Sequence, residues 1–381
     1  MAFKDANPCT RGAQRVNLDH AATSPLRPAA LEAMVSTPSL ANPSATHGAG
    51  RAARALLEDA REEIAGLLGV RPLEIILTSG GTEADGLALL GSVGERGRVW
   101  VSAVEHEAVA GLADPRLLGE RVSVVPVDQD GVVDVSALTP APGDVVSVMA
   151  VNNETGVVEP VPEVAARAHD AGAVVHTDAV QALGHVDVDL AGWGVDLASF
   201  SAHKIGGPVG IGALWVRRGV ELRPVLPGGG QQNGVRSGTQ TVMLARGFAA
   251  ALRESLGTLD AQRARWARLR RRLVEATASI PGVSVDGGTT VSPAICHLTV
   301  ESVRSADLLL VLDAAGIDCS AGSACHAGVA RPSQVMLAMG RTESQAAAGV
   351  RVSFGWSTTE ADLDHLLAVL PDAVERVRGA R

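Results

Sequence analysis

Short apolar runs alternate with amphipathic stretches through the first two-thirds of the chain. Seven runs between residues 73 and 216 have the length and β-branched content of buried strands: LEIILTS, RVWVSA, RVSVVPV, DVVSVMAV, AGAVVHTD, DLASFSA and IGALWV. Helical patterns separate several of them, as in segment 51–69, where leucines and an isoleucine line one side. This alternation predicts an α/β fold in which a mostly parallel sheet is sandwiched by helices. Ligand chemistry is then expected at the carboxyl ends of the strands.

The pattern changes at about residue 252. An Arg-rich amphipathic helix is predicted over 261–280, followed by a strand (294–300), a helix (305–316), a strand (349–355) and a last helix from Glu360. We therefore predict two domains. Residues 16–252 form a large ligand-binding domain, and residues 1–15 with 253–381 form a smaller α+β domain.

Composition narrows the possible functions. With 381 residues, 46% of them hydrophobic and 20% charged, the chain is expected to be a soluble globular protein. A net charge of -9 disfavours direct binding to nucleic acid or to an anionic membrane. The N-terminus lacks the apolar stretch of a secretory signal and no run approaches the roughly 20 apolar residues of a membrane span, so we expect a cytoplasmic protein.

A glycine-rich turn follows the first predicted strand. Gly80 and Gly81 lead into a helix that begins near Thr82. Backbone N–H groups at such a helix N-terminus, together with the helix dipole, favour a phosphate group. Taken alone, such a turn is more often a tight structural turn.

Two other predicted strands end in ionisable residues. Asp178 ends one strand, with Gln181 one helical turn later, and an N-cap aspartate is the simpler interpretation. The functional interpretation is that Asp178 keeps a pyridinium nitrogen protonated. Lys204 follows Ser201 and His203 between two apolar strands, where desolvation lowers the pKa of an amine and makes it a Schiff-base nucleophile. The order of these elements favours a pyridoxal-phosphate site over a nucleotide site.

Four cysteines are too few for a disulfide scaffold, so we expect reduced thiols, one of them reactive. Cys325 lies among Ala, Gly and Ser residues, where little packing suits a nucleophile that must move. Cys296 and Cys319 sit in or beside apolar strands and fit inert buried thiols. A metal site of Cys319, Cys325 and His326 with Cys296 and His297 lacks any short paired-cysteine spacing, so no metal is predicted.

Together these motifs resemble the cysteine desulfurase family, fold type I pyridoxal-phosphate enzymes of the class V aminotransferase superfamily, in the branch that serves iron-sulfur cluster assembly. The resemblance extends from NLDHAATSP at Asn17 to RVSFG at Arg351. Seven motifs occur in the family's order: SGGTEAD, EHEAV, VNNETG, HTDAVQ, SAHKIGGPVGIGAL, RSGT and CSAGSAC.

The resemblance implies a role for each matching residue. The catalytic residues would be Lys204, which carries the cofactor, Cys325, the sulfur acceptor, and His106, which stacks on the ring. Asp178 would pair with the ring nitrogen and Gln181 with the phenolic oxygen. The remaining residues implied to hold the cofactor, mainly through its phosphate, are Gly81, Thr82, Asn153, Ser201, His203 and Thr239. Asn153 and Arg351 would fix the substrate. In this family the threonine of RSGT reaches the neighbouring subunit's phosphate, so Thr239 implies a homodimer.

The implied reaction converts L-cysteine to L-alanine, leaves a persulfide on Cys325 and passes the sulfur to an acceptor such as an iron-sulfur scaffold protein. Iron-sulfur clusters, tRNA thiolation and DNA sulfur modification stay open as destinations. Another aminotransferase or lyase of the superfamily is one alternative, and a non-catalytic sulfur or metal carrier is a second. Three positions depart from the family: Gly86, where relatives usually have asparagine, His326, where many have threonine, and Cys9, which has no counterpart.

Overall fold

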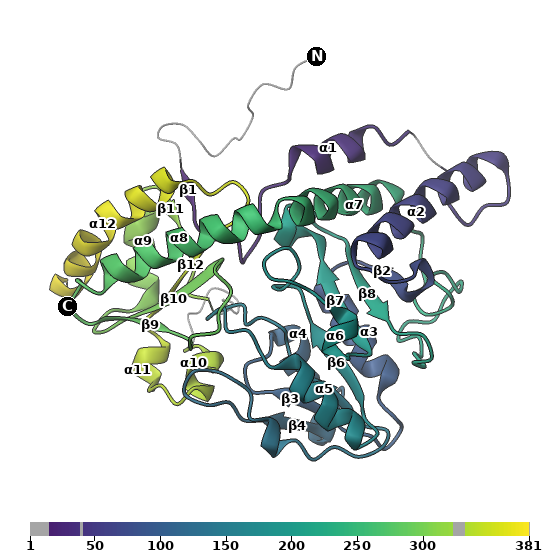
Figure 1. Ribbon diagram of the computed structural model, residues 1–381, viewed down its shortest axis with the longest axis horizontal. Helices are drawn as coiled ribbons and strands as arrows, with labels where there is room; N and C mark the ends of the chain where they lie inside the picture. The colour runs from purple at the N-terminus through teal and green to yellow at the C-terminus, as the bar shows by residue number, and fades with distance from the viewer. Residues whose placement is uncertain (1–14, 39–40, 323–331, 381) are drawn as a thin grey trace.

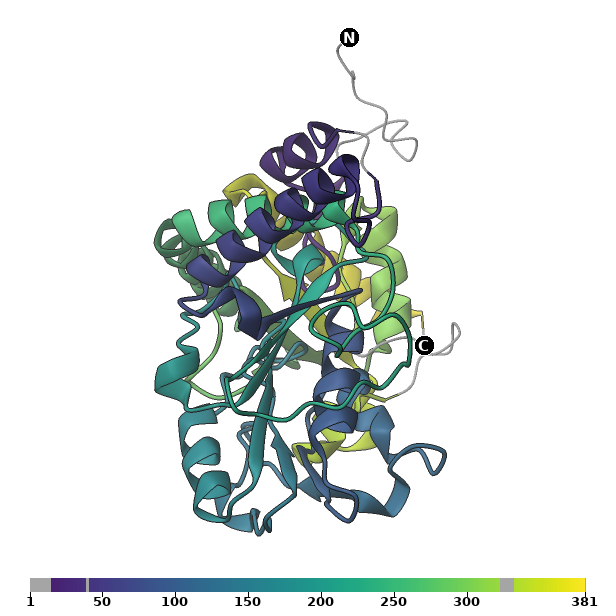
Figure 2. The same ribbon diagram turned by 90° about the vertical axis from the view of Figure 1, so that its right-hand side faces the viewer.

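The computed structural model describes residues 15–38, 41–322 and 332–380. Two parts lie side by side, a larger one built on a seven-stranded sheet and a smaller one built on a three-stranded sheet (Figure 1). In both views, helices α1 (Pro28–Val35), α2 (Gly48–Leu67) and α7 (Val242–Gly257) gather at one end of the larger part (Figure 2).

All seven predicted runs form strands of the larger sheet. In spatial order these are β2 (Ile75–Thr78), β8 (Gly212–Val216), β7 (Leu197–Ser201), β6 (Val174–Asp178), β5 (Val145–Ser147), β3 (Val99–Ser102) and β4 (Val122–Val125). Only β8 runs antiparallel to its neighbours within this sheet, pairing with β2 on one side and β7 on the other. The other neighbours pair in parallel. The prediction of an α/β fold with a mostly parallel sheet is therefore confirmed.

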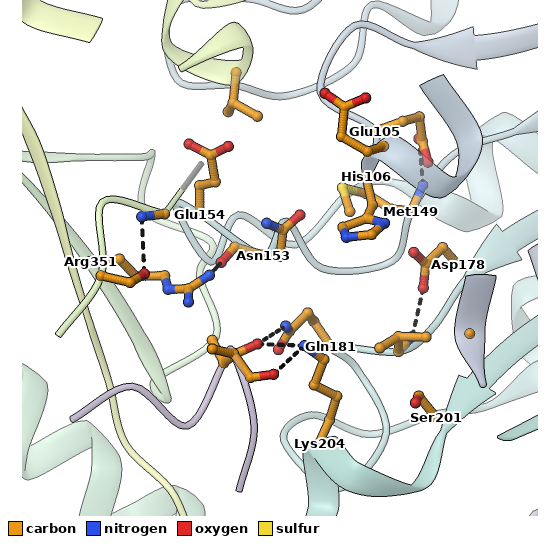
Figure 3. Close-up of a pocket in the computed structure, with 18 of the residues that line it drawn as sticks. Glu105, His106, Met149, Asn153, Glu154, Asp178, Gln181, Ser201, Lys204 and Arg351 are labelled. Atoms are coloured by element: carbon orange, nitrogen blue, oxygen red, sulfur yellow. Dashed lines mark hydrogen bonds between the residues drawn. The ribbon is translucent and has the colours of Figure 1, made fainter. Parts of the chain in front are cut away.

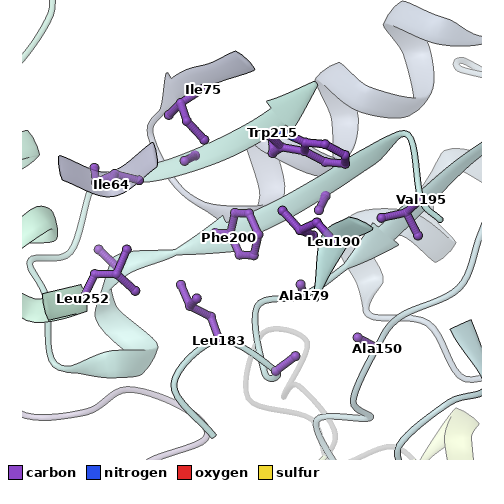
Figure 4. Packing of buried hydrophobic residues seen from close by; sticks show 14 of the residues in the cluster. Ile64, Ile75, Ala150, Ala179, Leu183, Leu190, Val195, Phe200, Trp215 and Leu252 are labelled. Carbon is purple, nitrogen blue, oxygen red and sulfur yellow. The ribbon is translucent and has the colours of Figure 1, made fainter. Parts of the chain in front are cut away.

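Alternate side chains of these strands enter two apolar layers. Ile75 and Leu77 join the core cluster that includes α2, α5 (Val161–Asp170) and α7, part of which is drawn in Figure 4. Ile76 instead packs with α3 (Gly81–Ser92) on the opposite face. Because successive side chains of a strand point to opposite faces, a sheet covered on both faces needs apolar residues at consecutive positions. This explains why the predicted strands are continuous apolar runs. Two short helices, α4 (Glu107–Ala110) and α6 (Leu190–Trp193), also flank the sheet.

The smaller part holds a second core. Its antiparallel sheet has the order β12 (Gly349–Ser353), β10 (Ile295–Val300), β9 (Val283–Asp286). Helices α8 (Leu259–Thr277), α9 (Ser305–Ala314) and α12 (Glu360–Gly379) pack on it around Trp266 and Phe354, and short helices α10 (Gln334–Ala338) and α11 (Glu343–Ala346) precede β12. The helices and strands predicted after residue 252 are all present. Strand β9 was not predicted, because its short segment leaves most of its side chains only partly buried.

The first described strand packs with the C-terminal part of the chain. β1 (Val16–Asn17) pairs in parallel with β11 (Ile317–Asp318), and Val16 and Leu18 belong to the second core. The division into residues 16–252 and 253–381 stays a prediction, and residues 1–14 lie outside the described residues.

Local signals explain the start of the last helix. Thr359 Oγ1 accepts a hydrogen bond from the Asp362 amide at 3.3 Å, and Asp362 Oδ2 accepts one from the Thr359 amide at 2.7 Å. Such a capping box satisfies two amide groups that have no partner within the helix. In the described part of the chain, no helix combines the length and apolar character needed to cross a bilayer.

Candidate active site

A cavity of about 960 Å³ lies at the carboxyl ends of β6 and β7, with walls from both parts of the molecule. Among the residues that line it are ten of the predicted site residues: Gly81, Thr82, His106, Asn153, Asp178, Gln181, Ser201, His203, Lys204 and Arg351. Figure 3 shows Arg351 and Glu154 on one side, His106, Asp178 and Ser201 on the other, and Gln181 and Lys204 between them.

Two predicted site residues are not among these lining residues. Thr239 lies on an exposed loop. Cys325 lies outside the described residues, as do Cys9 and His326. The described residues that flank this gap, including Gly322 and Pro332, do line the cavity.

Asp178 is the last residue of β6 and is buried. Burial raises the pKa of its carboxyl group, while the Val180 amide, His106 and Lys204 act in the opposite direction. Its Oδ1 accepts a hydrogen bond from Val180 N at 2.8 Å, as in an Asx turn. The following residues form a turn and not a helix, so the N-cap interpretation is wrong. Within the described residues Asp178 forms no ion pair, so a cation that enters the cavity would stabilise the ionised form.

Lys204 lies in the 3-10 turn Ala202–Ile205 that follows β7. Its Nζ donates hydrogen bonds to the carbonyl oxygens of Ala21 at 2.7 Å and Ala22 at 2.9 Å. Burial and then the charge of Arg351 lower the pKa of this amine to about 8, although Asp178 and Asp19 act to raise it. The structure therefore agrees with the interpretation of a partly desolvated amine.

Two glycines permit the close approaches that shape this region. A Cβ at Gly81 would lie 2.8 Å from Val180 Cγ2, and one at Gly206 would lie 2.7 Å from Arg27 Cγ. Gly206 also has a φ of +79°, which side chains with a Cβ rarely adopt. These glycines let α3 begin against the end of β6 and let the chain turn sharply after Lys204.

The first turn of α3 and the end of β7 form a cradle with the chemistry for a phosphate. Gly81, Thr82, Ser201 and His203 all line the cavity there. Burial and then the Lys204 charge lower the pKa of His203 to about 4, so its ring is neutral at physiological pH and offers one N–H donor. Its Nδ1 lies 3.2 Å from Thr23 Oγ1.

His106 is the N-cap residue of α4. Its Nδ1 accepts a hydrogen bond from the Ala108 amide at 3.1 Å. A neutral imidazole whose Nδ1 accepts must carry its proton on Nε2. His106 therefore presents a defined tautomer to the cavity.

The opposite wall centres on Arg351 of β12. Its guanidinium donates to the Asn153 carbonyl oxygen at 2.8 Å and pairs with Asp19 at 2.7 Å, while Nε is buried without a partner among the described residues. The backbone amide of Arg351 donates a hydrogen bond to Ser320 O at 2.7 Å. This bond joins β12 to the segment that ends at Gly322. A guanidinium with a free donor suits a carboxylate.

Sequence reasoning missed three buried carboxyl groups in the cavity wall, those of Asp85, Glu105 and Glu154. Burial raises the pKa of all three, that of Glu105 to about 8. Glu105 accepts from Ser102 Oγ at 2.6 Å and Met149 N at 2.8 Å, and Glu154 accepts from Ser333 Oγ at 2.6 Å. Each of these acidic residues lies within one of the seven motifs, next to predicted site residues. That position in the sequence could have identified them as further site residues.

The other cysteines differ in position. Cys296 lies in the second core, and burial raises the pKa of its thiol to about 11. Cys319 lines the cavity, where burial also raises its thiol pKa well above the usual value. Within the described ranges, no three His, Cys, Asp or Glu side chains come together in a way that would hold a metal ion.

Comparisons with known proteins follow this geometry. The family model described as aminotransferase class-V matches residues 16–366. An IscS-like cysteine desulfurase of Mycobacterium tuberculosis is 42% identical over 381 aligned residues, covering 95% of this chain and 97% of the relative. A solved NifS-like protein from Rickettsia africae superposes with a TM-score of 0.87 at 27% identity, over 95% of this chain and all of that one. A structure of SspA in complex with cysteine gives a TM-score of 0.78 at 29% identity, over 89% of this chain and 98% of that one.

Proposed function

The chain belongs to the class-V aminotransferase family, and from this premise we propose that it is a cysteine desulfurase. It converts L-cysteine to L-alanine and transfers the sulfur through a persulfide on Cys325 to an acceptor protein. The observation that carries the proposal is the cavity itself. It joins a buried amine of lowered pKa on Lys204, a buried carboxylate without a cation on Asp178, and a buried guanidinium on Arg351.

These residues fit pyridoxal phosphate as the cofactor. Gly81, Thr82, Ser201 and His203 would hold its phosphate, and Asp178 has the charge and burial to pair with a protonated ring nitrogen. Lys204 would hold it covalently, with His106 over the ring, while the remaining contacts would come from Gln181, Asn153 and Thr239. When bound, the cofactor supplies an electron sink for negative charge that develops on the substrate's α-carbon.

The protein's own groups perform the other tasks. Arg351 binds the substrate carboxylate, helped by Asn153. The Lys204 amine, with a pKa of about 8, moves a proton to and from the α-carbon near neutral pH. The Cys325 thiolate attacks the substrate sulfur: a sulfur-sulfur bond forms, the carbon-sulfur bond breaks, and protonation of the carbon product gives alanine. Reduced thiols of this kind fit a cytoplasmic location.

The decisive experiment follows both products in the wild-type protein and in Cys325→Ala. With a thiol reductant added to release the persulfide sulfur as sulfide, we expect cysteine-dependent alanine and sulfide with the wild type, and loss of both in the variant while the visible band of bound cofactor persists. Cys296→Ala is the matched control and should keep the activity. Alanine formation unchanged in Cys325→Ala would mean that Cys325 is not the nucleophile, and a colourless protein insensitive to borohydride would favour a non-catalytic carrier.

We also propose that the enzyme acts as a homodimer. Exposed apolar side chains lie on α1, on the turn after β7 and at the start of α7, including Val35 (71% exposed), Val209 (74%) and Met243 (46%). These elements pack together, because a Cβ at Gly247 of α7 would lie 2.7 Å from Met34 Cγ and 3.1 Å from Pro208 Cγ. A second copy would cover this apolar surface and bring Thr239 to the neighbouring site. Light scattering of wild type and Val35→Asp tests this, and a monomeric wild type would contradict it.

A further inference from the structure

A buried polar network lies behind Asp178 and has no role in the proposed reaction. His176 is two residues before Asp178 on β6, so the two side chains share one face of the sheet. Helix α3 covers the sheet there and contributes Asp85, which also lines the cavity. The flanking strands contribute Ser147 from β5 and Ser199 from β7.

The hydrogen-bond distances define this network. Ser147 Oγ lies 2.8 Å from His176 Nδ1, and Ser199 Oγ lies 2.9 Å from His176 Nε2. Asp85 Oδ1 lies 3.6 Å from the same Nε2 and has no hydrogen-bond partner among the described residues. Ser199 is also the residue opposite Asp178 in the parallel pairing of β6 and β7. The hydrogen bonds of Ser147, His176 and Ser199 thus reach the strand position beside Asp178, and Asp85 lies next to His176.

The surroundings of Asp85 disfavour a negative charge. Its side chain is 2% exposed, and the titratable groups that face it are Asp178, Glu105 and His176. Burial, and then the charge of Asp178, raises the pKa of Asp85 well above its ordinary value. Burial lowers the pKa of His176 to about 3, so the imidazole is neutral and provides no counter-charge. An ionised Asp85 would be a buried anion without a cation, which is strongly unfavourable.

We propose that Asp85 is a positioning residue, a neutral carboxylic acid that holds the Ser199 and His176 side chains in one arrangement and leaves Asp178 as the anion that faces the cofactor ring nitrogen. This inference rests on the proposed function, because it assigns Asp85 a task only when pyridoxal phosphate binds. Asp85 acts through its neighbours and not on the reacting atoms. Loss of its carboxyl group would free Ser199 and His176 to rearrange and would let water reach Asp178, which would change the field at the ring.

Three variants separate a neutral acid from an anion. We compare Asp85→Asn, Asp85→Ala and the control Asp144→Asn, measuring the dissociation constant for added pyridoxal phosphate and the visible band of the bound cofactor as a function of pH. Asp144 is another buried carboxylate of the same sheet, but it precedes β5 and accepts from Arg98 N at 2.8 Å and Trp100 Nε1 at 3.0 Å. The control should leave cofactor binding and the band unchanged.

If Asp85 is a neutral acid, the two variants at position 85 should behave differently. Asp85→Asn replaces one neutral hydrogen-bonding group with another and should stay within about two-fold of wild type in affinity, with the same pH midpoint. Asp85→Ala should weaken cofactor affinity about ten-fold and move the midpoint of the band. Circular dichroism checks that each variant folds. If Asp85→Ala does not fold, Ser199→Ala replaces it with the same expectation, because it removes a hydroxyl that bonds His176 and also acts on the Asp85 carboxyl group.

Two results would overturn the inference. In the first, Asp85→Asn changes the cofactor affinity, or the pH midpoint of the cofactor band, as much as Asp85→Ala does. That result would mean that cofactor binding depends on the negative charge of Asp85. A neutral acid would then be excluded. Asp85→Ala, or Ser199→Ala in its place, indistinguishable from wild type would remove the positioning role. Failure of the proposed function looks different: a non-catalytic carrier would bind no pyridoxal phosphate, and another enzyme of the superfamily would bind it without forming alanine from cysteine.

Discussion

The two walls of the cavity are built in different ways. On the wall of the larger part, the functional groups sit at the ends of β6 and β7 and at the start of α3, inside a sheet covered on both faces. On the wall of the smaller part, Arg351 stands on one strand of a three-stranded sheet, next to the segments that flank residues 323–331.

Their electrostatics also differ. Asp178, Lys204 and His203 are desolvated. Burial raises the pKa of Asp178 and lowers the pKa of Lys204 and His203, and in each case this favours the neutral form. Arg351 instead keeps a carboxylate partner, Asp19, at 2.7 Å. The difference suggests that the two walls have different roles. The first wall would hold the cofactor through groups whose pKa values are shifted by burial, and the second would bind the anionic substrate through the positive charge of Arg351. Breaking each wall separately tests this difference in roles.

The largest effect is expected on the first wall. Lys204→Ala removes the amine that we propose holds the cofactor and moves the proton, so alanine formation should fall by about a thousand-fold or more. Lys4 and Lys204 are the only lysines in the sequence, so Lys4→Ala is a matched control that should keep borohydride-dependent labelling. Mass spectrometry of the reduced protein locates the label. A label on Lys204→Ala of normal yield would contradict the assignment.

On the second wall, Arg351→Gln should act on the substrate alone. Loss of a charge-assisted hydrogen bond to the substrate carboxylate should raise the KM for cysteine by about 10- to 100-fold, while the cofactor band stays unchanged. Arg341→Gln is the matched control, because Arg341 pairs with Asp286 at 3.4 Å and is not among the residues that line the cavity. Loss of the cofactor band in Arg351→Gln would contradict this difference in roles between the walls.

The pKa of Lys204, on the first wall, can be measured directly. Only the neutral amine reacts with an aldehyde, so capture of pyridoxal phosphate by cofactor-free protein, trapped with borohydride, should rise as pH rises. Below a pKa of about 8 for Lys204 the rate should gain about ten-fold per pH unit, and above it the rate should level off. A midpoint near the ordinary lysine value of 10.5 would show that the amine is not desolvated.

The smallest effect is expected for Cys296 and Cys319, the thiols that the structure describes. Cys319→Ala and Cys296→Ala should change alanine formation by less than about two-fold, because burial keeps both thiols protonated. Cys296→Ala should also lower the free energy of unfolding by about 1 kcal/mol, since a fully buried side chain leaves a small cavity. Kinetics and urea denaturation give both numbers. A large activity loss in Cys319→Ala would mean that this cavity-lining thiol takes part in the reaction.

Most of the fold was predictable because the local signals agree with the tertiary arrangement. Continuous apolar runs such as 145–151 are typical of strands buried on both faces, and their alternation with helices favoured a mostly parallel sheet. The pattern did not reveal that β8 runs antiparallel to its neighbours. The strand-end chemistry followed from the same logic, since Asp178 and Lys204 each end or follow such a run. β9 was not predicted, because a strand of four residues is too short to show a clear alternation of apolar and polar positions.

The sequence by itself determined the element types and the class of fold and predicted ten of the residues that line the cavity, because apolar periodicity and residue chemistry are local properties. Only the tertiary structure decided the acidity of the buried carboxyl groups. Asp85, Glu105 and Glu154 resemble ordinary acidic residues along the chain, and packing of other segments over them excludes water and raises the pKa of each. Solvent exclusion depends on contacts between distant residues, as when α3 brings Asp85 to His176 across 91 positions of sequence, from 85 to 176.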